Sequence, residues 1–359
     1  MDKALPLVIP PTICWSHNAH ILSIVLRNTD ALPWFFSNFI QLSCVNTKIN
    51  PSLPLTLRFY EYYENIEDWF YYALTPQRFI KIEKVFKGTL LAHNVDIWDF
   101  IVRNIDLGRY IYTSIDEFYV PMKDAYGAYS CQHDIFIHGY DKQNQQIIVS
   151  GFFNYMYQES KIPYEAFLKG FTATNDLDGL DFNPYYSNVY CIEPTSILKS
   201  ALNFDHIINM LTDFLESKDS SNRYNMFNFQ DKSDHNLIYG LKTYDYLINE
   251  VEMILLNQKE CDIKPFQLLW EHKKIMFARI HFINENFSAG ISISTITLCE
   301  DLISSSLIMR NHMLKFQVTK DATTIKSLVD QLKHCHDKDQ IFTKQFLQEI
   351  LSWRETYEL

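Results

Sequence analysis

The sequence has no cluster of basic residues and no long apolar run, and each absence excludes a class of protein. Its 359 residues include 32 Lys and Arg against 43 Asp and Glu, a formal net charge of −11, which argues against non-specific binding to nucleic acid or an anionic membrane. No window reaches the ~18 uninterrupted apolar residues of a membrane-spanning helix. Residues 1–11 lack a basic start and are interrupted by prolines, so we expect no signal peptide and a cytoplasmic protein.

Cysteines are present but show no paired framework. There are seven, an odd number scattered along the chain, which is typical of reduced thiols. The sequence also lacks an internal repeat of roughly 20–50 residues. Hydrophobic residues make up 47% of the chain and aromatic residues 15%, so it can bury a large core.

A β-hairpin is predicted at the centre of the first half of the chain. Two strand-like runs, 134–140 and 147–153, flank a polar segment, 141–146, that contains no hydrophobic residue. If the loop is symmetric, Tyr140 pairs with Ile147. Counting outward then places His133 opposite Asn154, with both side chains on one face of the hairpin.

A largely buried helix is predicted over residues 15–27, directly after Cys14. Ala19, Leu22 and Leu26 recur at helical spacing, and the polar residues fall on one narrow stripe. Cys14 would lie at the start of this helix. Free backbone N–H groups and the helix dipole at such a position lower a thiol pKa and can also bind an oxyanion.

The chain is predicted to divide near residue 193. Residues 1–193 contain both helix and strand patterns, including a strand at 109–114, and we assign them to one catalytic domain. From residue 194 strand signals become rare, and we assign residues 194–359 to a helical domain. Its helical patterns cover residues 195–216, 237–257, 264–286, 292–318, 323–334 and 340–352.

Cys14, His133 and Asn154 form the leading catalytic hypothesis. A thiolate would attack an acyl carbon, the histidine would carry the proton, and the carboxamide would fix the histidine tautomer. Asp141 is too distant for the third role, since ~3.3 Å per strand residue places it roughly 26 Å from His133. Asp134 is adjacent to His133, but strand alternation predicts that its side chain leaves the opposite face.

Other polar residues are weaker candidates for a metal-binding or catalytic site. A metal site could use Cys14-x-x-His17-x-x-His20 or the tract 334–336, but neither provides the paired ligand couples typical of zinc, and no metal is expected. His17 could instead line a pocket next to Cys14. The consecutive carboxylates Asp116 and Glu117 suggest acid–base chemistry or a solvated strand end.

Two exposed-loop candidates complete the predicted site. Tyr126 and Tyr129 precede His133 closely enough to line a substrate cleft, although packing is an equally good interpretation.

Three motifs resemble a known family. They are Ile-Asp-Glu-Phe-Tyr-Val-Pro at 115–121, His-Asp-Ile-Phe-Ile-His-Gly-Tyr-Asp at 133–141, and Ile-Ile-Val-Ser at 147–150 before a Pro-Tyr-Glu helix. Together with the N-terminal Cys14, they resemble the papain-like acyltransferases of the butirosin-biosynthesis type, over roughly residues 10–200. Within that family, the amide-forming branch of closthioamide assembly is the most similar in length.

This resemblance implies an α+β fold with a papain-like core, in which an N-terminal helix carrying the cysteine packs against an antiparallel sheet. It also implies a mostly helical C-terminal half. Such proteins move an acyl group from a carrier-protein thioester to an amine in antibiotic biosynthesis, with Cys14 as acyl acceptor and His133 as base. Relatives often carry Asp where this chain has Ser150-Gly151, and Asn154 is our candidate replacement.

Three functions stay open at this point. The first is an amide-forming acyltransferase that needs no cofactor of its own, because an acyl or peptidyl carrier protein presents the donor on its phosphopantetheinyl arm to an amine or diamine. The second is a cysteine peptidase or amidase that uses water as the acceptor. The third is a non-catalytic binding protein that has the same fold.

Overall fold

The computed structural model describes residues 2–49, 53–60, 79–153, 156–174, 187–195, 199–220, 223 and 237–357. Contacts divide the chain into two compact units, the first from Met1–Ala31 and Tyr63–Lys199, the second from Leu32–Tyr62 and Ser200–Leu359. The prediction of an α+β chain with an antiparallel sheet and a helical C-terminal half is confirmed. The predicted division near residue 193 differs from the contacts, which place Leu32–Tyr62 with the C-terminal helices.

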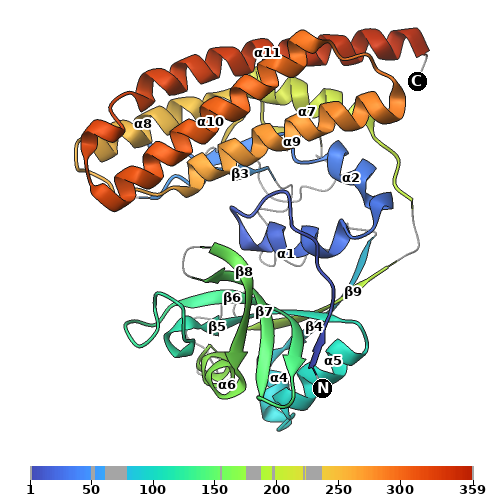
Figure 1. Cartoon of the computed structure of the whole chain (residues 1–359), viewed down its shortest axis with the longest axis vertical. Helices are drawn as coiled ribbons and strands as arrows, with labels where there is room; N and C mark the ends of the chain where they lie inside the picture. Colours follow the sequence, from blue (N-terminus) through green and yellow to red (C-terminus); the bar gives the residue numbers. More distant parts are fainter. Residues whose placement is uncertain are drawn as a thin grey trace. The chain divides into compact units, whose positions relative to one another are not determined.

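The described residues of the first unit form a seven-stranded antiparallel sheet (Figure 1). The order is β4-β9-β5-β6-β7-β8, and β1 pairs with the end of β6. The strands are β1 (Asp2–Ala4), β4 (Ile80–Phe86), β5 (Tyr110–Asp116), β6 (Gln132–Asp141), β7 (Gln146–Phe153), β8 (Met156–Pro163) and β9 (Asn188–Pro194).

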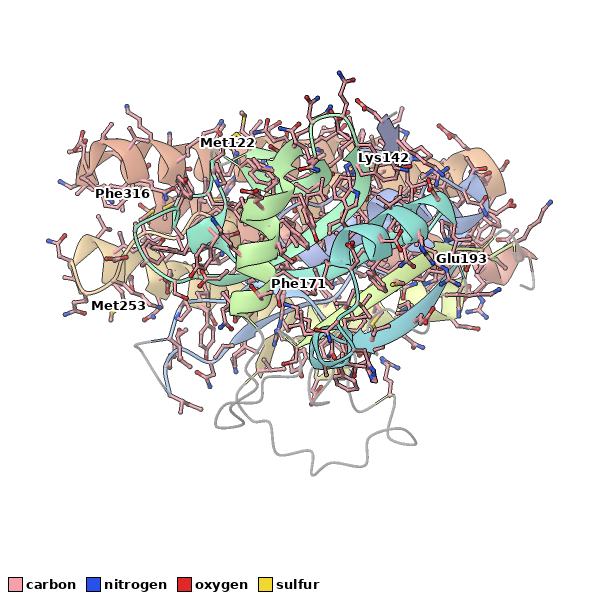
Figure 2. All side chains as sticks on the ribbon, turned by 90° about the horizontal axis from the view of Figure 1, so that it is seen from below. Met122, Lys142, Phe171, Glu193, Met253 and Phe316 are labelled. Carbon is pink, nitrogen blue, oxygen red and sulfur yellow. The ribbon has the colours of Figure 1, made fainter. Side chains whose placement is uncertain are left out.

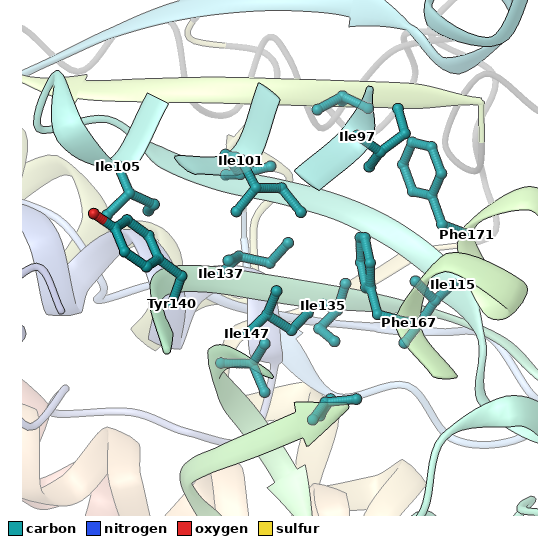
Figure 3. Packing of buried hydrophobic residues seen from close by; sticks show 14 of the residues in the cluster. Ile97, Ile101, Ile105, Ile115, Ile135, Ile137, Tyr140, Ile147, Phe167 and Phe171 are labelled. Carbon is teal, nitrogen blue, oxygen red and sulfur yellow. The ribbon is translucent and has the colours of Figure 1, made fainter. Parts of the chain in front are cut away.

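Alternation along β5 and β6 gives the sheet two different faces. The odd-numbered side chains Ile111, Ile115, Ile135 and Ile137 join a hydrophobic core with α5 (Ile97–Asp106) and α6 (Tyr164–Ala173), as Figure 3 shows. The even-numbered side chains of β5 and β6 carry most of the polar groups that face α1 (Ser16–Val25). Asp134 therefore lies on the α1 face of the sheet, whereas the side chain of His133, an odd-numbered residue of the same strand, starts from the opposite face.

The hairpin of β6 and β7 follows the predicted pairing only at its tip. Tyr140 pairs with Ile147 as expected, but a β-bulge at His138 shifts the register, so that Ile137 pairs with Val149 and Phe136 with Ser150. The observed register at Phe136 thus differs by one residue from the predicted one, which would pair Phe136 with Gly151. Asn154, the predicted partner of His133, lies outside the described residues, so that pairing stays a prediction.

The Gly-Tyr-Asp motif at the end of β6 has a structural role at each position. A Cβ on Gly139 would lie 2.5 Å from the backbone oxygen of Lys3, so only glycine lets β1 approach β6. Tyr140 Oη donates a 2.8 Å hydrogen bond to Asp106 Oδ1. Asp141 accepts hydrogen bonds from the backbone and side-chain nitrogens of Asn144, at 3.1 and 2.8 Å, and so closes the hairpin turn.

Several elements of the first unit differ from the sequence prediction. Residues 162 and 163 end β8 instead of opening a helix, and α6 begins at Tyr164. The strand β8 was missed because its sequence, M-Y-Q-E-S-K-I-P, is mostly polar, as suits an edge strand. The sequence also predicts a helix at 65–74 and an exposed loop at 176–187, and these residues lie wholly or almost wholly outside the described part of the chain.

The second unit is mainly helical, as predicted. Its long helices are α9 (Lys264–Phe287), α10 (Ile293–Thr319) and α11 (Leu328–Tyr357), which are consecutive in the chain (Figure 1). The two helices predicted at 323–334 and 340–352 are one continuous helix, α11. The remaining elements of this unit are α2 (Leu32–Ser37), β2 (Leu42–Val45), β3 (Arg58–Phe59), α7 (Phe204–Glu216), β10 (Leu237–Tyr239) and α8 (Thr243–Leu255).

No helix in the described part of the chain is long and apolar enough to cross a membrane.

Candidate functional site

Helix α1 positions the start of the candidate site. The helix begins at Ser16, two residues after Cys14, and every residue from Asn18 to Val25 is buried. Cys14 itself is 5% exposed. Trp15 occupies the N-cap position with an extended backbone and makes no side-chain capping hydrogen bond. The predicted arrangement of a thiol just before a buried helix is thus present.

Asp134 is the central residue of the site. It lies on β6 and is 6% exposed. Its Oδ2 accepts hydrogen bonds from Ser16 Oγ at 2.6 Å and from Tyr112 Oη at 2.7 Å, and His20 Nε2 lies 3.7 Å away. Its Oδ1 lies 2.7 Å from His133 Nδ1. Four side chains from α1, β5 and β6 therefore surround one carboxylate.

The charge state of Asp134 follows from these partners. Burial by itself would raise the pKa of the carboxyl. The positive charge and hydrogen bond of His133, with those of His20, outweigh burial and hold the pKa of Asp134 well below its usual value. The carboxylate is therefore ionised at neutral pH and acts only as an acceptor.

His133 is the more exposed member of the pair, with 47% of its side chain accessible. Burial lowers its pKa, but the charge and hydrogen bond of Asp134 and the charge of Glu117 raise it above its usual value overall. Because the neighbour of Nδ1 is a carboxylate, Nδ1 carries the proton and donates it. Nε2 is then the acceptor nitrogen of the neutral ring, as a general base requires.

The sequence-based rejection of Asp134 is therefore wrong. Alternation fixes the direction of Cα–Cβ bonds, whereas Nδ1 is only one bond beyond Cγ and stays close to the backbone. The ring of His133 lies along its own strand, where Nδ1 is also 3.4 Å from the backbone oxygen of Asp134. A neighbouring carboxylate can therefore reach Nδ1 even from the other face. Asp134 is thus close enough to orient the His133 ring, whereas Asn154, the residue to which the sequence analysis gave that role, lies outside the described residues.

His20 joins the site from the second turn of α1. It is buried and stacks on Phe136, with ring centroids 4.7 Å apart and planes at 17°. Its Nδ1 lies 2.9 Å from Tyr157 Oη. Burial is the main cause that lowers the pKa of His20, and burial also raises that of Tyr157, so both are neutral. Tyr157 then donates to Nδ1, and the Nε2–H of the neutral ring faces Asp134.

Cys14 is connected to this network through its helix. Ser16 is bonded to Asp134, and two residues of chain span at most ~7 Å, so the Cα of Cys14 lies within that distance of the Cα of Ser16. The start of α1 and the start of β6 are thus held together by Asp134. A thiol, an imidazole and a carboxylate that orients the imidazole are the groups that nucleophilic acyl chemistry uses.

Glu117 is a further acidic neighbour of His133. Its Oε1 lies 3.8 Å from His133 Nδ1 and 2.7 Å from Lys123 Nζ. The sequence showed Glu117 only as one of two consecutive carboxylates after β5. Nothing in the spacing indicated that Lys123 returns to it across a turn.

The remaining predicted site residues take different positions. Asp116 accepts hydrogen bonds from Phe118 N, Ser130 Oγ and Cys131 N at 2.7–3.0 Å, so it closes the loop that follows β5. Tyr126 and Tyr129 lie on that loop and are 55% and 58% exposed. His17 is half-buried in the first turn of α1, its ring centroid 6.4 Å from that of Trp15.

Among the described residues, no group of three or more His, Cys, Asp or Glu side chains is arranged to hold a metal ion. Neither protein-family models nor curated proteins match this chain.

Proposed function

We propose that this chain is a cysteine-dependent acyltransferase with a papain-like core, which forms amide bonds from acyl thioesters. One observation carries the proposal. The two oxygens of Asp134 connect Ser16, two residues after Cys14, to Nδ1 of His133. This link between the chain just after the thiol and Nδ1 of the imidazole supports the assignment of Cys14 as nucleophile and His133 as base. The motif resemblance supports the same chemistry.

Each proposed step has a defined role for these residues. His133 Nε2 takes the thiol proton, and the Cys14 sulfur attacks the thioester carbonyl carbon. The donor C–S bond breaks, and the departing thiolate receives the proton. An amine nitrogen then attacks the acyl-cysteine, a C–N bond forms, and the C–S bond to Cys14 breaks. His133 moves the amine proton to the Cys14 sulfur. Asp134 stabilises the imidazolium in both steps.

The donor in this proposal is an acyl group on the phosphopantetheinyl arm of an acyl or peptidyl carrier protein, and the acceptor is a small amine. An arm of this kind presents a thioester at the end of a narrow chain, which suits a thiol that is only 5% exposed.

Intact-mass spectrometry tests the proposal. The protein is incubated with octanoyl-N-acetylcysteamine, a small thioester, and the mass should increase by one acyl group. Cys14→Ala should show no adduct, whereas Cys131→Ala, which removes a more exposed thiol, should behave as wild type.

The same assay separates the alternatives. Butylamine should discharge the adduct as an octanoyl amide. Discharge only as octanoic acid would indicate a hydrolase. An unmodified protein, or an adduct that persists in Cys14→Ala, would contradict the proposed nucleophile.

A further inference from the structure

A lysine ammonium group lies in a small site beside His133. Lys123 Nζ is 2.7 Å from Glu117 Oε1 and 4.4 Å from the ring centroid of Phe153. A carboxylate on one side and an aromatic face on the other are the two groups that bind alkylammonium ions best. The side chains of Lys123 and Glu117 are only 8% and 12% exposed, so the site is largely closed to solvent.

This ammonium group is close to the proposed base. The distances of 2.7 Å from Lys123 Nζ and 3.8 Å from His133 Nδ1 share one atom, Glu117 Oε1, so Nζ lies no more than about 6.5 Å from Nδ1. The charges act on each other: Glu117 raises the pKa of His133 and Lys123 lowers it. Replacing Lys123 by another cation beside Glu117 would therefore change the pKa of His133.

The segment that carries Lys123 is a turn with an unusual backbone. Met122, labelled in Figure 2, has a φ of +71°, a left-handed conformation that costs energy for a residue with a side chain. The side chain of Met122 is 46% exposed, so its burial does not offset the cost of this backbone conformation. The contacts of Lys123 with Glu117 and Phe153 are among the interactions that stabilise this turn.

We propose that Lys123 is an internal occupant of an alkylammonium-binding subsite formed by Glu117 and Phe153, and that a cationic ligand binds there by displacing it. In assigning the ligand to the acceptor amine, the inference rests on the proposed function. An ammonium group held by Glu117 is protonated and cannot attack a thioester. The acceptor would therefore carry a second, reacting amino group, and Lys123 would close the subsite until such a molecule arrives.

Chemical complementation tests the subsite without any catalysis. Lys123→Ala removes the side chain beyond Cβ, which is three methylene groups and the ammonium, and leaves its carboxylate and aromatic partners. Isothermal titration calorimetry should show that n-butylammonium binds Lys123→Ala at least ~10-fold more tightly than wild type, because the tethered ammonium no longer competes. The uncharged analogue n-butanol should not bind. Adding Glu117→Gln to Lys123→Ala should abolish the gain.

A second readout applies if Lys123→Ala is unstable. Its midpoint of thermal unfolding should then rise with n-butylammonium and not with n-butanol. A folded Lys123→Ala that binds no n-butylammonium, or binds it equally with Glu117→Gln present, would overturn the inference, as would an unstable variant that the ion does not stabilise.

The binding measurements are repeated in a Cys14→Ala background, where no acyl transfer can contribute. Their outcome is then independent of the acyl-adduct assay. The subsite can fail while Cys14 still forms an adduct, and Cys14 can fail while the subsite still binds the ion.

Discussion

Ser16 Oγ donates a 2.6 Å hydrogen bond to Asp134 Oδ2, and this bond joins residues 118 positions apart in the chain. It fixes the first turn of α1 against the start of β6. The same carboxylate holds His133 through its other oxygen, at 2.7 Å from Nδ1. Asp134 is therefore both a structural link and the group that sets the tautomer and basicity of His133.

Asp134→Asn should lower the pKa of His133, because the carboxylate is its main source of upward shift. NMR titration of the His133 ring should show the shift, and the acidic limb of the acyl-transfer rate should move to lower pH. The wrong tautomer should also reduce the rate by ~10²–10⁴-fold. Asp124→Asn, the same change at an exposed position in the loop, is the control. An unchanged His133 pKa would contradict the assigned pairing.

The same pair makes stability depend on pH in a defined window. The folded-state pKa of His133 is raised, so its contribution is complete below the unfolded value of 6.5 and is lost as pH rises through the folded value. The folded-state pKa of Asp134 is lowered, so its contribution is complete above the unfolded value of 3.8 and is lost as pH falls through the folded value. The wild type should exceed Asp134→Asn in stability most clearly between the two unfolded pKa values, 3.8 and 6.5. Urea unfolding at several pH values would show this.

Iodoacetamide should label Cys14 before the other cysteines. Burial raises the pKa of Cys44, Cys191 and Cys299 to about 12, and that of Cys261 and Cys335 to about 11, so these thiols react slowly. The pKa of Cys131 is also raised, by burial and by nearby acidic groups. Peptide mapping after brief alkylation at pH 7.5 would identify the modified residue. If Cys131 is labelled first, the prediction is wrong, and solvent exposure determines the alkylation rate more than the position of Cys14 before α1 does.

Gly139→Ala should detach β1 from the sheet. The added Cβ would lie 2.5 Å from Lys3 O and 2.9 Å from the Cα of Ala4, and both are backbone atoms that cannot move independently. We expect a loss of ~1–3 kcal/mol in unfolding free energy, as is usual for overpacking. Gly151→Ala is a matched control on β7, where the nearest atom would be 3.8 Å away. Hydrogen exchange of residues 2–4 should accelerate only in Gly139→Ala.

The hairpin tip was predictable because a polar loop between two apolar runs sets the pairing of Tyr140 with Ile147 without help from the rest of the chain. The bulge at His138 was not predictable, since it depends on the approach of β1, whose Leu5 N donates to His138 O at 2.7 Å. One extra residue there shifts the register by one position, so that Phe136 pairs with Ser150 and not with Gly151.

Helix α1 was predictable because Ala19 and Leu22 recur at helical spacing with Leu26, which follows the helix. The hydrogen bond that joins α1 to the sheet was not predictable, because Ser16 and Asp134 are common residue types and no sequence pattern links them. The placement of Leu32–Tyr62 in the second unit likewise depends on distant contacts. Arg279, fully buried on α9, donates to the backbone oxygens of Phe36 and Phe39, and sequence periodicity carries no information about such bonds.

Lys87 offers a test of buried charge in the first unit. It opens α4 (Lys87–Ala92), is fully buried, and donates to Ser114 Oγ at 2.9 Å, to Ser114 O and to Thr174 Oγ1. All these acceptors are neutral, and burial lowers the pKa of its ammonium to about 7. The pKa of the unfolded chain is 10.5, so between these values the unfolded state binds more protons than the folded state.

The difference in unfolding free energy between wild type and Lys87→Met should therefore change with pH. It should shift in favour of the wild type as pH rises from about 7 to about 10.5, with a slope of up to ~1.4 kcal/mol per pH unit. Below about pH 7 both states of the wild type bind the proton, and the difference should be constant. Lys169→Met, on the exposed side of α6, should show no such slope. Urea unfolding at pH 6, 7.5 and 9 measures all three proteins. A difference between wild type and Lys87→Met that stays the same from pH 7.5 to 9 would show that the neutral oxygens around Lys87 hold its ammonium charged despite burial.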